Sequence, residues 1–461
     1  MARAIGAAAL LALAGCGASA ADGVIAETLE LPALRIRARA GHASGRERDA
    51  FARWDERRAI ARDELVRLAV VRARGLAADA LRVRAMLEDA RAEESLPPPE
   101  LGAEAWNVPL ARPYQLGEAD MYMVELRQMI PSPGSLGARA QARAQEARAM
   151  AADLVVRERA VTRRAADAYG DYVGLWLEHG VHEEHAARVA QMVDTARARY
   201  PAGGTMLVDV ARLDIEMARE RRNVTRVRGA LGRARAAINA LLRRPSRAPL
   251  GPPSNLVPAT VRHSLEELLV LARNSRAEVT AAVARTRAAM AATEAAEREA
   301  STPSFMVGGG YWQDPAERPG FGATVSMTLP WISGAGRARA RASALRTRAE
   351  RAAIDAARAA ARGEVGEGHA RVLAVEQELA VVRGDVLPAA ARAVEAAASA
   401  YGSGQGDLTS WLDATRMVLD ARMEEAALIA ELEHAVAELE QAVGTHLRRA
   451  PLRSAPERST P

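Results

Sequence analysis

Short alternating stretches of apolar and polar residues occur twice in the chain and predict strands. In the first, Tyr122, Val124 and Leu126 share one face, while Glu125 and Arg127 share the other. A second stretch, 199 residues later, repeats the pattern. Its apolar face contains Phe321, Ala323 and Val325, and its polar face contains Thr324 and Ser326. One apolar and one polar face fit either a soluble sheet with one wet face or the wall of a membrane barrel.

Each alternating stretch continues into a proline–glycine corner and then into a long helical pattern. The first corner contains Pro131, Pro133 and Gly134, and the second contains Pro330 and Gly334. The helices predicted after these corners cover residues 136–200 and 336–401, about 65 residues or roughly 97 Å each. Shorter helices are predicted over 57–94, 205–242, 264–299 and 407–447.

This succession predicts a mostly helical α+β fold built as an internal tandem repeat. Asp63 and Glu266 begin stretches that align with each other. The expected segments are repeat 1 over 57–245 with strands at about 95–131, a proline-rich linker over 246–262, repeat 2 over 263–450 with strands at about 303–330, and a disordered tail over 451–461. Long alanine-rich helices bury little apolar area each, so they need lateral neighbours and predict an oligomer.

The N-terminus predicts export from the cytoplasm. Residues 1–15 have the layout of a signal peptide, because the apolar run over 5–14 is too short to span a bilayer. Cys16, the only cysteine, ends a Leu-Ala-Gly-Cys sequence that resembles a bacterial lipobox, so 16–56 is expected to be a lipidated N-terminal arm. Ordinary cleavage after Ala20 is the alternative. A lone cysteine excludes a disulfide within the chain.

Composition narrows the classes of function. All 63 basic residues are arginines, and the 58 acidic residues are interleaved with them, which suits solvated helix faces better than a nucleic-acid surface. The densest basic stretch lies early in the second long helix and consists of Arg337, Arg339, Arg341, Arg346 and Arg348. No nucleophile triad, phosphate loop or catalytic cysteine pair occurs, so the sequence predicts neither an enzyme nor a bound cofactor.

The duplication, the two corners and the breaks after Tyr200 and Tyr401 resemble the TolC-type outer membrane efflux channels, also called outer membrane factors. The resemblance covers about residues 57–450. It implies a homotrimer in which four strands per chain form a twelve-stranded transmembrane barrel, continued by a long periplasmic coiled-coil tunnel. It also implies the outer membrane of a Gram-negative bacterium and its lipids as the location, with a periplasmic adaptor protein and an inner-membrane RND transporter as partners.

One region is similar to the CzcC-like branch of that family, which serves heavy-metal efflux. It reads LPPPELGAEAWNVPL, followed by MYMVELRQMIPSPGSLGARA. This resemblance implies passive export of heavy-metal cations, although Ser135 stands where the branch usually carries a basic residue. A drug or type I secretion exit duct of the same fold is one alternative. A periplasmic coiled-coil adaptor or structural lipoprotein is the alternative from another class.

By the same resemblance, the two helix breaks are periplasmic tips where the tunnel closes and the adaptor docks, and the corners join barrel to tunnel. The tip residues concerned are Tyr200, Gly203, Gly204, Thr205, Asp209, Tyr401, Gly404, Gly406, Asp407 and Asp413. Three copies of Asp209 or Asp413 around a pore would form an anionic ring that favours cations. Ser410 and Gly406 replace an aspartate and an arginine of the family's gate. Turn glycines and a helix-dipole carboxylate are the plainer interpretations.

Two groups of side chains are weak candidates for metal ligands: Met121, Met123 and Met129 on the first strand, and His179, His182 and His185 on the first long helix. Thioethers bind Cu(I) or Ag(I), and imidazoles suit zinc. The methionines are interpreted more simply as gap-filling apolar residues. The histidines are three residues apart and drift around the helix, so surface histidines are the favoured interpretation.

Overall fold

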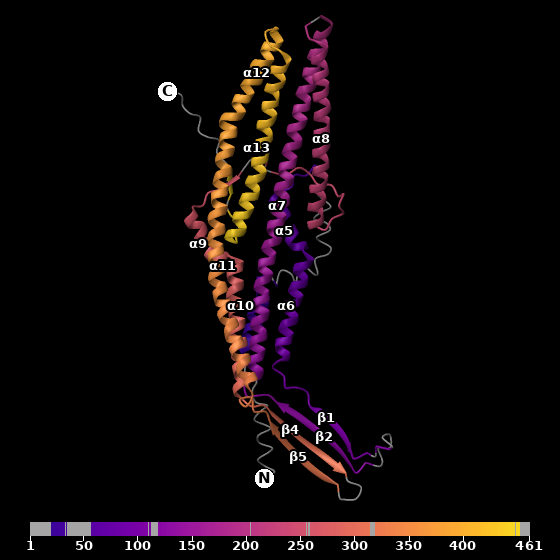
Figure 1. The fold of residues 1–461 in the computed structure, drawn as a ribbon, viewed down its shortest axis with the longest axis vertical. Helices are drawn as coiled ribbons and strands as arrows, with labels where there is room; N and C mark the ends of the chain where they lie inside the picture. Colours follow the sequence, from indigo (N-terminus) through magenta and orange to yellow (C-terminus); the bar gives the residue numbers. More distant parts are fainter. Residues whose placement is uncertain are drawn as a thin grey trace. The chain divides into compact units, whose positions relative to one another are not determined.

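The computed structural model describes residues 20–32, 34, 57–108, 110–111, 119–202, 204–254, 256, 259–313, 319–447 and 449–451. Figure 1 labels its helices and strands. They form two compact units. Unit 1 takes its described residues from Met1–Ala38, Ala77–Val155 and Glu278–Ala357, and unit 2 takes them from Arg39–Leu76, Val156–Ala277 and Arg358–Pro461. Each unit therefore combines segments from both halves of the sequence.

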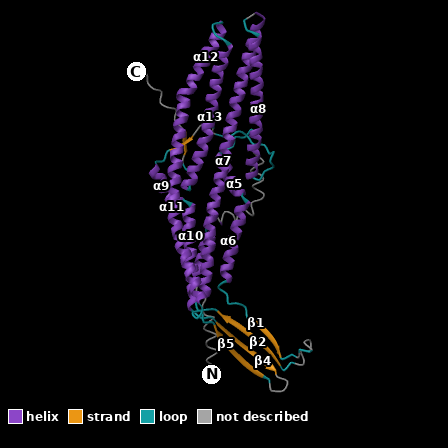
Figure 2. Ribbon diagram, viewed as in Figure 1, coloured by secondary structure: helices purple, strands orange, loops and turns teal. Residues whose placement is uncertain are grey.

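Unit 1 contains a four-stranded antiparallel sheet in the order β1-β2-β4-β5 (Figure 2). The strands are β1 (Glu100–Trp106), β2 (Met121–Ile130), β4 (Phe305–Gln313) and β5 (Gly320–Met327). Each of the ranges 95–131 and 303–330 thus holds two strands, as the alternation predicts. The central pairing of β2 with β4 joins the two halves of the chain, with Leu126 opposite Gly309.

Five helices or helix segments complete unit 1: α2 (Ala20–Leu29), most of α6 (Arg74–Ala92), the start of α7 (Ser135–Arg199), α10 (Ala277–Ser301) and the start of α11 (Gly334–Val381). Hydroxyl groups join α10 to α11, because Thr293 Oγ1 lies 3.0 Å from Ser343 Oγ and 2.9 Å from Thr347 Oγ1. A Cβ on Gly336 would lie 3.2 Å from Ala300, so this glycine lets the two helices approach closely. One side of α11 is therefore packed against α10.

The N-terminal arm is more ordered than the sequence suggests over its described part. Residues Ala20–Leu29 form α2, which buries Ala21, Ile25 and Thr28. Glu27 of this helix pairs with Arg148 of α7 at 2.7 Å. The sequence of residues 17–55 carries few structural signals and predicts a tether or loosely ordered arm; this prediction is wrong over Ala20–Leu29, because that segment has an apolar face and a charge partner on α7. The signal peptide and Cys16 lie outside the described residues.

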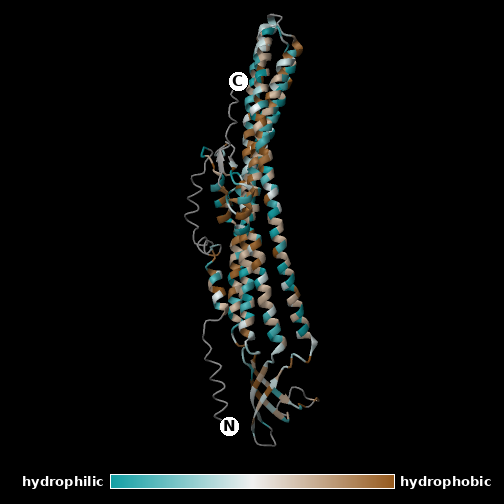
Figure 3. Cartoon of the chain, turned by 90° about the vertical axis from the view of Figure 1, so that its left-hand side faces the viewer, coloured by the Kyte–Doolittle hydropathy of each residue, from teal (hydrophilic) through white to brown (hydrophobic). Residues whose placement is uncertain are grey.

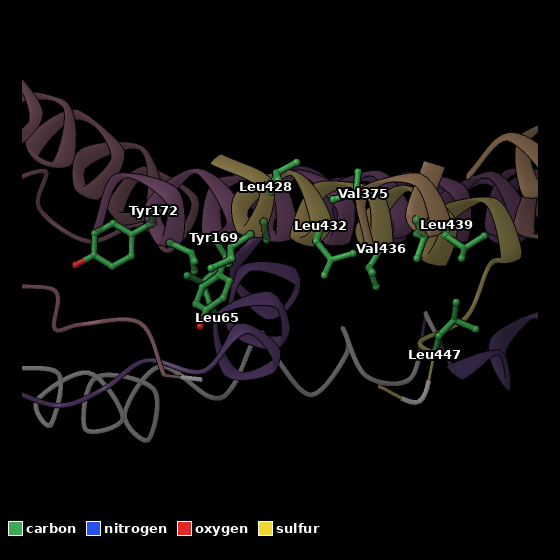
Figure 4. Packing of buried hydrophobic residues seen from close by; sticks show 14 of the residues in the cluster. Leu65, Tyr169, Tyr172, Val375, Leu428, Leu432, Val436, Leu439 and Leu447 are labelled. Carbon is green, nitrogen blue, oxygen red and sulfur yellow. The ribbon is translucent and has the colours of Figure 1, made fainter. Parts of the chain in front are cut away.

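Unit 2 is built from helices around an apolar core. It contains α5 (Arg62–Arg72), the rest of α7, the 3₁₀ turn η2 (Tyr200–Ala202), α8 (Leu207–Leu241), α9 (Leu265–Ser275), the rest of α11, the π turn η3 (Val382–Val386), α12 (Leu387–Ser403) and α13 (Leu408–Val443). Figure 4 shows part of this core, in which Leu432, Val436 and Leu439 of α13 lie in one cluster with Leu65 of α5 and Tyr169 of α7. Each fully buried leucine contributes roughly 1.5–3 kcal/mol of transfer free energy.

The two shorter predicted helices over 57–94 and 264–299 are each broken in two, contrary to the prediction. The breaks fall at Ala73 and Arg276. Arg72 donates to the carbonyl of Leu242 at 3.2 Å, and Arg276 donates to the carbonyl of Ala442 at 2.7 Å. Both arginines satisfy carbonyls at the C-terminal end of another helix, which its own hydrogen bonds leave open. The breaks therefore depend on tertiary contacts that local helix propensity does not encode.

The second long helix also differs from its prediction. The expected helix over 336–401 is interrupted by the π turn Val382–Val386, which ends two residues before Pro388. Proline has no backbone N–H and its ring crowds the carbonyl four residues earlier, so an interior proline disturbs the regular hydrogen bonds. The first long helix has no proline in this stretch and runs unbroken over Ser135–Arg199.

The proline-rich linker over 246–262 is held against unit 2 rather than free. Tyr169 and Tyr172 of α7 donate hydroxyl hydrogen bonds to the carbonyls of Ser254 (2.7 Å) and Gly251 (2.9 Å). The linker also ends in the short strand β3 (Ala259–Val261), which pairs with β6 (Arg449–Pro451). The tail expected over 451–461 lies outside the described residues after Pro451.

Apolar and polar residues interleave along the helices of both units (Figure 3). Among the residues that the structure describes, no helix is long and apolar enough to cross a membrane.

Candidate functional site

The first hairpin end joins α7 to α8 in unit 2. Tyr200 begins the 3₁₀ turn and is 45% exposed. The N–H of Gly204 donates to the carbonyl of Arg199 at 3.0 Å, which closes the turn. Asp209 lies in the first turn of α8, which begins at Leu207 rather than at the predicted residue 205. Gly203 lies outside the described residues.

The second hairpin end joins α12 to α13 and has a tighter set of local contacts. Gly404 ends α12 with φ +77°, a conformation that favours glycine. Gly406 follows so closely that a Cβ there would lie 2.9 Å from the Cβ of Ala400. The carboxylate of Asp407 then caps α13 by accepting from the N–H of Ser410 at 2.9 Å. This backbone hydrogen bond holds the pKa of Asp407 below its ordinary value of 3.8.

Tyr401 connects the two hairpin ends. Its hydroxyl lies 2.8 Å from Thr205 Oγ1, and its carbonyl accepts from Arg199 Nη1 at 2.5 Å. The guanidinium of Arg199 also lies 4.9 Å from the centre of the Tyr401 ring, and Trp411 stacks on the same ring at 5.2 Å. Tyr401 itself is only 6% exposed. Polar and aromatic contacts from both hairpins therefore converge on this one side chain.

The sequence prediction includes Tyr401 and Thr205 but misses Arg199 and Trp411. Arg199 precedes the break in a chain with 63 arginines, so nothing in its local sequence distinguishes it. Trp411 is the clearer signal, because aromatic residues make up only 3% of the chain and this one lies ten residues after Tyr401. A further polar contact, from Arg212 to Thr409 Oγ1 at 3.0 Å, also joins the hairpins.

The two predicted tip aspartates each lie near an arginine of their own helix but differ in exposure. Asp209 lies 3.8 Å from Arg212, and Asp413 lies 3.7 Å from Arg416, in each case a residue three positions later in the same helix. The side chain of Asp413 is 55% exposed, whereas that of Asp209 is 17% exposed. Each carboxylate therefore has a neighbouring positive charge within the chain.

Histidines of α7 enter a buried polar layer, which corrects their interpretation as surface residues. His182 and His185 are each 4% exposed. His182 Nδ1 lies 2.9 Å from Glu220 of α8. Burial lowers the pKa of His185 below its ordinary 6.5. His179 remains partly exposed beside Glu183.

The polar layer continues to α13 through a carboxylate and an arginine. Arg416 donates to both oxygens of Glu216, at 3.0 and 2.6 Å. The Arg416 hydrogen bond holds the pKa of Glu216 below its ordinary 4.5. Within the described part of the chain, no group of three or more His, Cys, Asp or Glu residues could hold a metal ion. The layer therefore joins α7, α8 and α13 through charge and hydrogen bonds.

The sheet of unit 1 separates its side chains into an apolar face and a polar face. The strand register places apolar residues together on one face, namely Leu101, Val124, Leu126, Tyr311, Phe321 and Val325. Four of these six are at least 50% exposed: Leu101, Leu126, Phe321 and Val325. An exposed apolar sheet face of this kind marks an interaction or lipid-facing surface.

Glycines make room for charged side chains on the polar face. Glu125 is paired across the strands with Gly102 and Gly310, and it is only 8% exposed. Its carboxylate lies 3.1 Å from Arg127, which is opposite Gly308. The long side chains thus lie across the flat surface that the glycines leave open.

The same face carries the methionine candidates for metal binding. Met121 is paired with Trp106, and Met129 with Met306. Met123 is paired with Glu104 on one side and Trp312 on the other. The strand register therefore places different neighbours around each methionine.

Both predicted corners occur where strands become helices in unit 1. Gly134 has φ +74° directly before α7, and Pro131 is buried. The N–H of Ser135 donates to the carbonyl of Ser132 at 2.9 Å, so the first corner is a closed turn. After Pro330, the second corner enters α11 at Gly334.

Residues 268–445 match the model of the family described as Outer membrane efflux protein. No curated protein sequence matches the chain significantly. Solved structures of several proteins are similar in fold at low sequence identity. The outer membrane protein VceC from the bacterial pathogen Vibrio cholerae is 16% identical, with a TM-score of 0.68 over 83% of this chain and 96% of VceC. CusC is 17% identical, with a TM-score of 0.69 over 84% of this chain and 92% of its own.

The MtrE outer membrane channel of Neisseria gonorrhoeae, solved in an open state, is 19% identical with a TM-score of 0.65, covering 85% of this chain and 90% of that one. The chain has the fold of these three proteins. The family match covers only the second half, so the shared fold is the finding that extends across both halves. It confirms the mostly helical architecture with a small antiparallel sheet that the sequence predicts.

Proposed function

We propose that this protein is the outer-membrane exit duct of a tripartite, RND-type efflux system and exports its substrate passively. The observation that carries the proposal is the four-stranded sheet with an exposed apolar face, continued by long helices in a fold shared with outer-membrane channels. Three such chains supply twelve strands, enough to close a barrel around a pore. The duct is a homotrimer, lipidated at Cys16, that reaches from the outer membrane into the periplasm.

The two hairpin ends act as the tips that close the duct and receive the periplasmic adaptor. Support comes from the contacts around Tyr401, which join the two hairpins through Thr205 and Arg199. Asp209 and Asp413 contribute carboxylates near the pore and favour cations.

Heavy-metal cations are the proposed substrate class, on the strength of the CzcC-like sequence around the first corner and of the two tip carboxylates. A drug or type I secretion exit duct of the same fold remains the alternative substrate assignment. The shared fold favours either duct over a periplasmic adaptor or structural lipoprotein, because the fold similarity covers 83–85% of the chain.

Growth of a strain that lacks the gene tests this assignment. The strain is complemented with wild-type protein or with an empty vector and exposed to Zn, Co, Cd, Cu and Ag salts and to hydrophobic drugs. We expect sensitivity to one group of metals that the wild-type gene rescues. Sensitivity to drugs alone would keep the duct and remove the metal assignment. If the protein in membrane extracts forms no trimer that resists mild SDS and dissociates on heating, the duct itself is wrong.

A further inference from the structure

The start of α11 carries an unusual concentration of positive charge at the surface. Arg337, Arg339 and Arg341 are all exposed, and the helix has no acidic residue before Glu350. Within the described part of the chain, no ion pair involves these three arginines; Arg341 donates only to the backbone carbonyl of Arg337, at 3.4 Å. Three unpaired guanidinium groups in five residues form a surface suited to an anionic partner.

The arginines project on two sides of the helix. At about 100° per residue, Arg337 and Arg341 point to one side of α11 and Arg339 points to the opposite side. The side packed on α10 lies between them and carries Ser343 and Thr347. The three guanidinium groups therefore straddle the exposed surface of the helix rather than form one row, so they can reach separate anionic groups.

A cavity lined by both polar and apolar residues lies beside this helix start, between the two strand-to-helix corners of unit 1. It has a volume of about 240 Å³, and its lining includes Ser132, Arg139, Glu299, Thr328, Ser333 and Arg339. Arg139 and Glu299 form an ion pair with each other, so the charge of Arg339 is left uncompensated in the lining. A cavity with hydroxyl groups and one net positive charge suits a phosphate group.

Apolar residues adjoin the arginines on the side of the sheet. Trp331 is 47% exposed and Ile332 is 72% exposed, and they lie between the apolar-faced strand β5 and the first turn of α11. Tryptophan is enriched where membrane hydrocarbon meets headgroups, and arginine is favoured just beyond it. Along the chain, the apolar strand is followed by the tryptophan and then by the arginines. The regions of a membrane that favour such residues, hydrocarbon, interface and headgroups, follow one another in the same order.

From these observations we propose that Arg337, Arg339 and Arg341 bind the phosphate of anionic phospholipid headgroups at the membrane surface next to the sheet. The inference rests on the proposed location in the outer membrane. The distance along α11 from the end of the sheet limits the proposed site to these three arginines. They lie about 4.5–10 Å along α11 from Gly334, whereas Arg346 and Arg348 lie about 18 and 21 Å along it. A headgroup layer is only roughly 5–8 Å thick, so Arg337 and Arg339 lie within it and Arg341 lies at its edge, whereas the two later arginines lie well beyond it.

The test measures the lipid preference of the full-length trimer reconstituted in phosphatidylcholine bilayers. Spin-labelled phosphatidylglycerol and spin-labelled phosphatidylcholine are compared for their association with wild-type protein. We expect phosphatidylglycerol to associate about fivefold more strongly, the ratio that one arginine contact at a membrane surface supplies. The preference should fall to about one in the R337Q/R339Q/R341Q variant and should survive in the R337K/R339K/R341K variant, which keeps the charge.

A matched control removes the same charge from the same helix farther from the sheet. R346Q/R348Q/R351Q changes three exposed arginines and should keep the preference of the wild type. Equal loss in both glutamine variants would overturn the proposal, because the preference would then be a general effect of net charge. Loss of the trimer in R337Q/R339Q/R341Q alone would also overturn it, because the arginines would then bind a second copy of the chain.

Two further outcomes distinguish failure of the headgroup site from failure of the proposed function. Wild-type protein that inserts but shows no lipid preference contradicts the headgroup site while leaving the duct intact. Wild-type protein that inserts in no bilayer contradicts the proposed function itself. Excess soluble glycerophosphoglycerol distinguishes the phosphate sources: if it abolishes the preference, the site binds a soluble phosphodiester rather than a membrane surface, and the proposal is wrong.

Discussion

The two strand-to-helix corners share a sequence pattern but present different surfaces. At the first corner Ser132 and Ser135 are buried, and Gly134 turns the chain back against Arg298. At the second corner Trp331 and Ile332 are exposed. The same strand, proline and helix thus produce a covered junction in one half of the chain and an open one in the other.

The two corners also differ in whether the arginines that follow them have acidic partners. The arginines in the first turns of α7 each have an acidic partner, in the pairs Arg139–Glu299, Arg143–Glu146 and Arg148–Glu27. The arginines in the first turns of α11 have none within the described residues. Exposed ion pairs add little stability each, so the difference matters for what the surface can bind more than for folding.

At the hairpin ends the assignment is the opposite: the end in the first half is open and the end in the second half is covered. Tyr200 in the first half is 45% exposed, whereas Tyr401 in the second half is 6% exposed and makes the contacts that join the hairpins. Each half therefore has one covered junction and one open junction. Similar sequence patterns in the two halves thus acquire different roles, because different residues pack around them. Paired substitutions at matching positions can test whether the roles differ.

The largest expected difference is between the two tyrosines. Tyr401→Ala removes a buried ring together with its contacts to Arg199 and Thr205, and should lower the opening free energy of the hairpin ends by about 3 kcal/mol. Tyr200→Ala should change it by less than about 0.5 kcal/mol, because the side chain is nearly half exposed. Amide hydrogen exchange at the two hairpin ends measures both values. Equal losses would contradict the account of Tyr401 as the joining residue.

The second difference concerns the glycines at the corners. Gly134 has φ +74°, so Gly134→Ala should destabilise the protein by about 1–2 kcal/mol through backbone strain. Gly334 has no neighbour within 4 Å of a Cβ position and no positive φ, so Gly334→Ala should be neutral or stabilise by up to about 1 kcal/mol. Thermal unfolding of the two variants provides the measurement. A loss of similar size at both glycines would show that the corners are equally constrained.

The smallest effect is a pair of opposite pH dependences within unit 2. His434 of α13 lies 3.4 Å from Asp167 and 3.1 Å from Asp171, and the Asp167 hydrogen bond raises the pKa of His434 above 6.5. This contribution to stability is full below pH 6.5 and is lost as pH rises through the raised pKa. Burial instead lowers the pKa of His185, so its contribution is full above pH 6.5 and is lost as pH falls towards the lowered pKa.

Denaturant midpoints at about pH 5.5 and pH 8 check these signs. His434→Gln should destabilise the protein more at the lower pH. His185→Gln should compare better with wild type at the lower pH, because the variant has no buried imidazole to protonate. If the two variants shift the midpoint in the same direction with pH, the assigned environments of these histidines are wrong.

Much of the fold follows from local pattern. The helix predicted over 136–200 occurs at Ser135–Arg199, and alternating residues identify β2 and β5, because period and punctuation are properties of the sequence itself. The breaks at Ala73 and Arg276 do not follow, because they depend on arginines that reach the ends of other helices. The two breaks themselves lie at matching positions, ten residues after the aligned starts at Asp63 and Glu266, and this supports the predicted internal repeat.

The candidate site is predictable only in part. Glycine and tyrosine mark the helix breaks, so Tyr401, Gly404 and Asp407 are found from sequence. Burial cannot be found from the local sequence in this way. The histidine spacing predicts His182 as a surface residue, although Glu220 of α8 holds it in a buried polar layer. Partners that are distant in the chain determine such environments, and a single sequence does not reveal them.

The account depends most on the apolar face of the sheet lying against lipid. Val325 on that face is 73% exposed, and its neighbour Thr324 is exposed on the opposite face. Arginine on the lipid face of a barrel costs about 2–4 kcal/mol at the middle of the bilayer, whereas arginine on the inner face is tolerated.

The decisive measurement is therefore ion conductance across planar bilayers by wild-type protein and by the V325R and T324R variants. The account predicts steady conductance for wild type and T324R and little or no insertion of V325R. Absence of conductance for wild type, or equal insertion of the two variants, would contradict it.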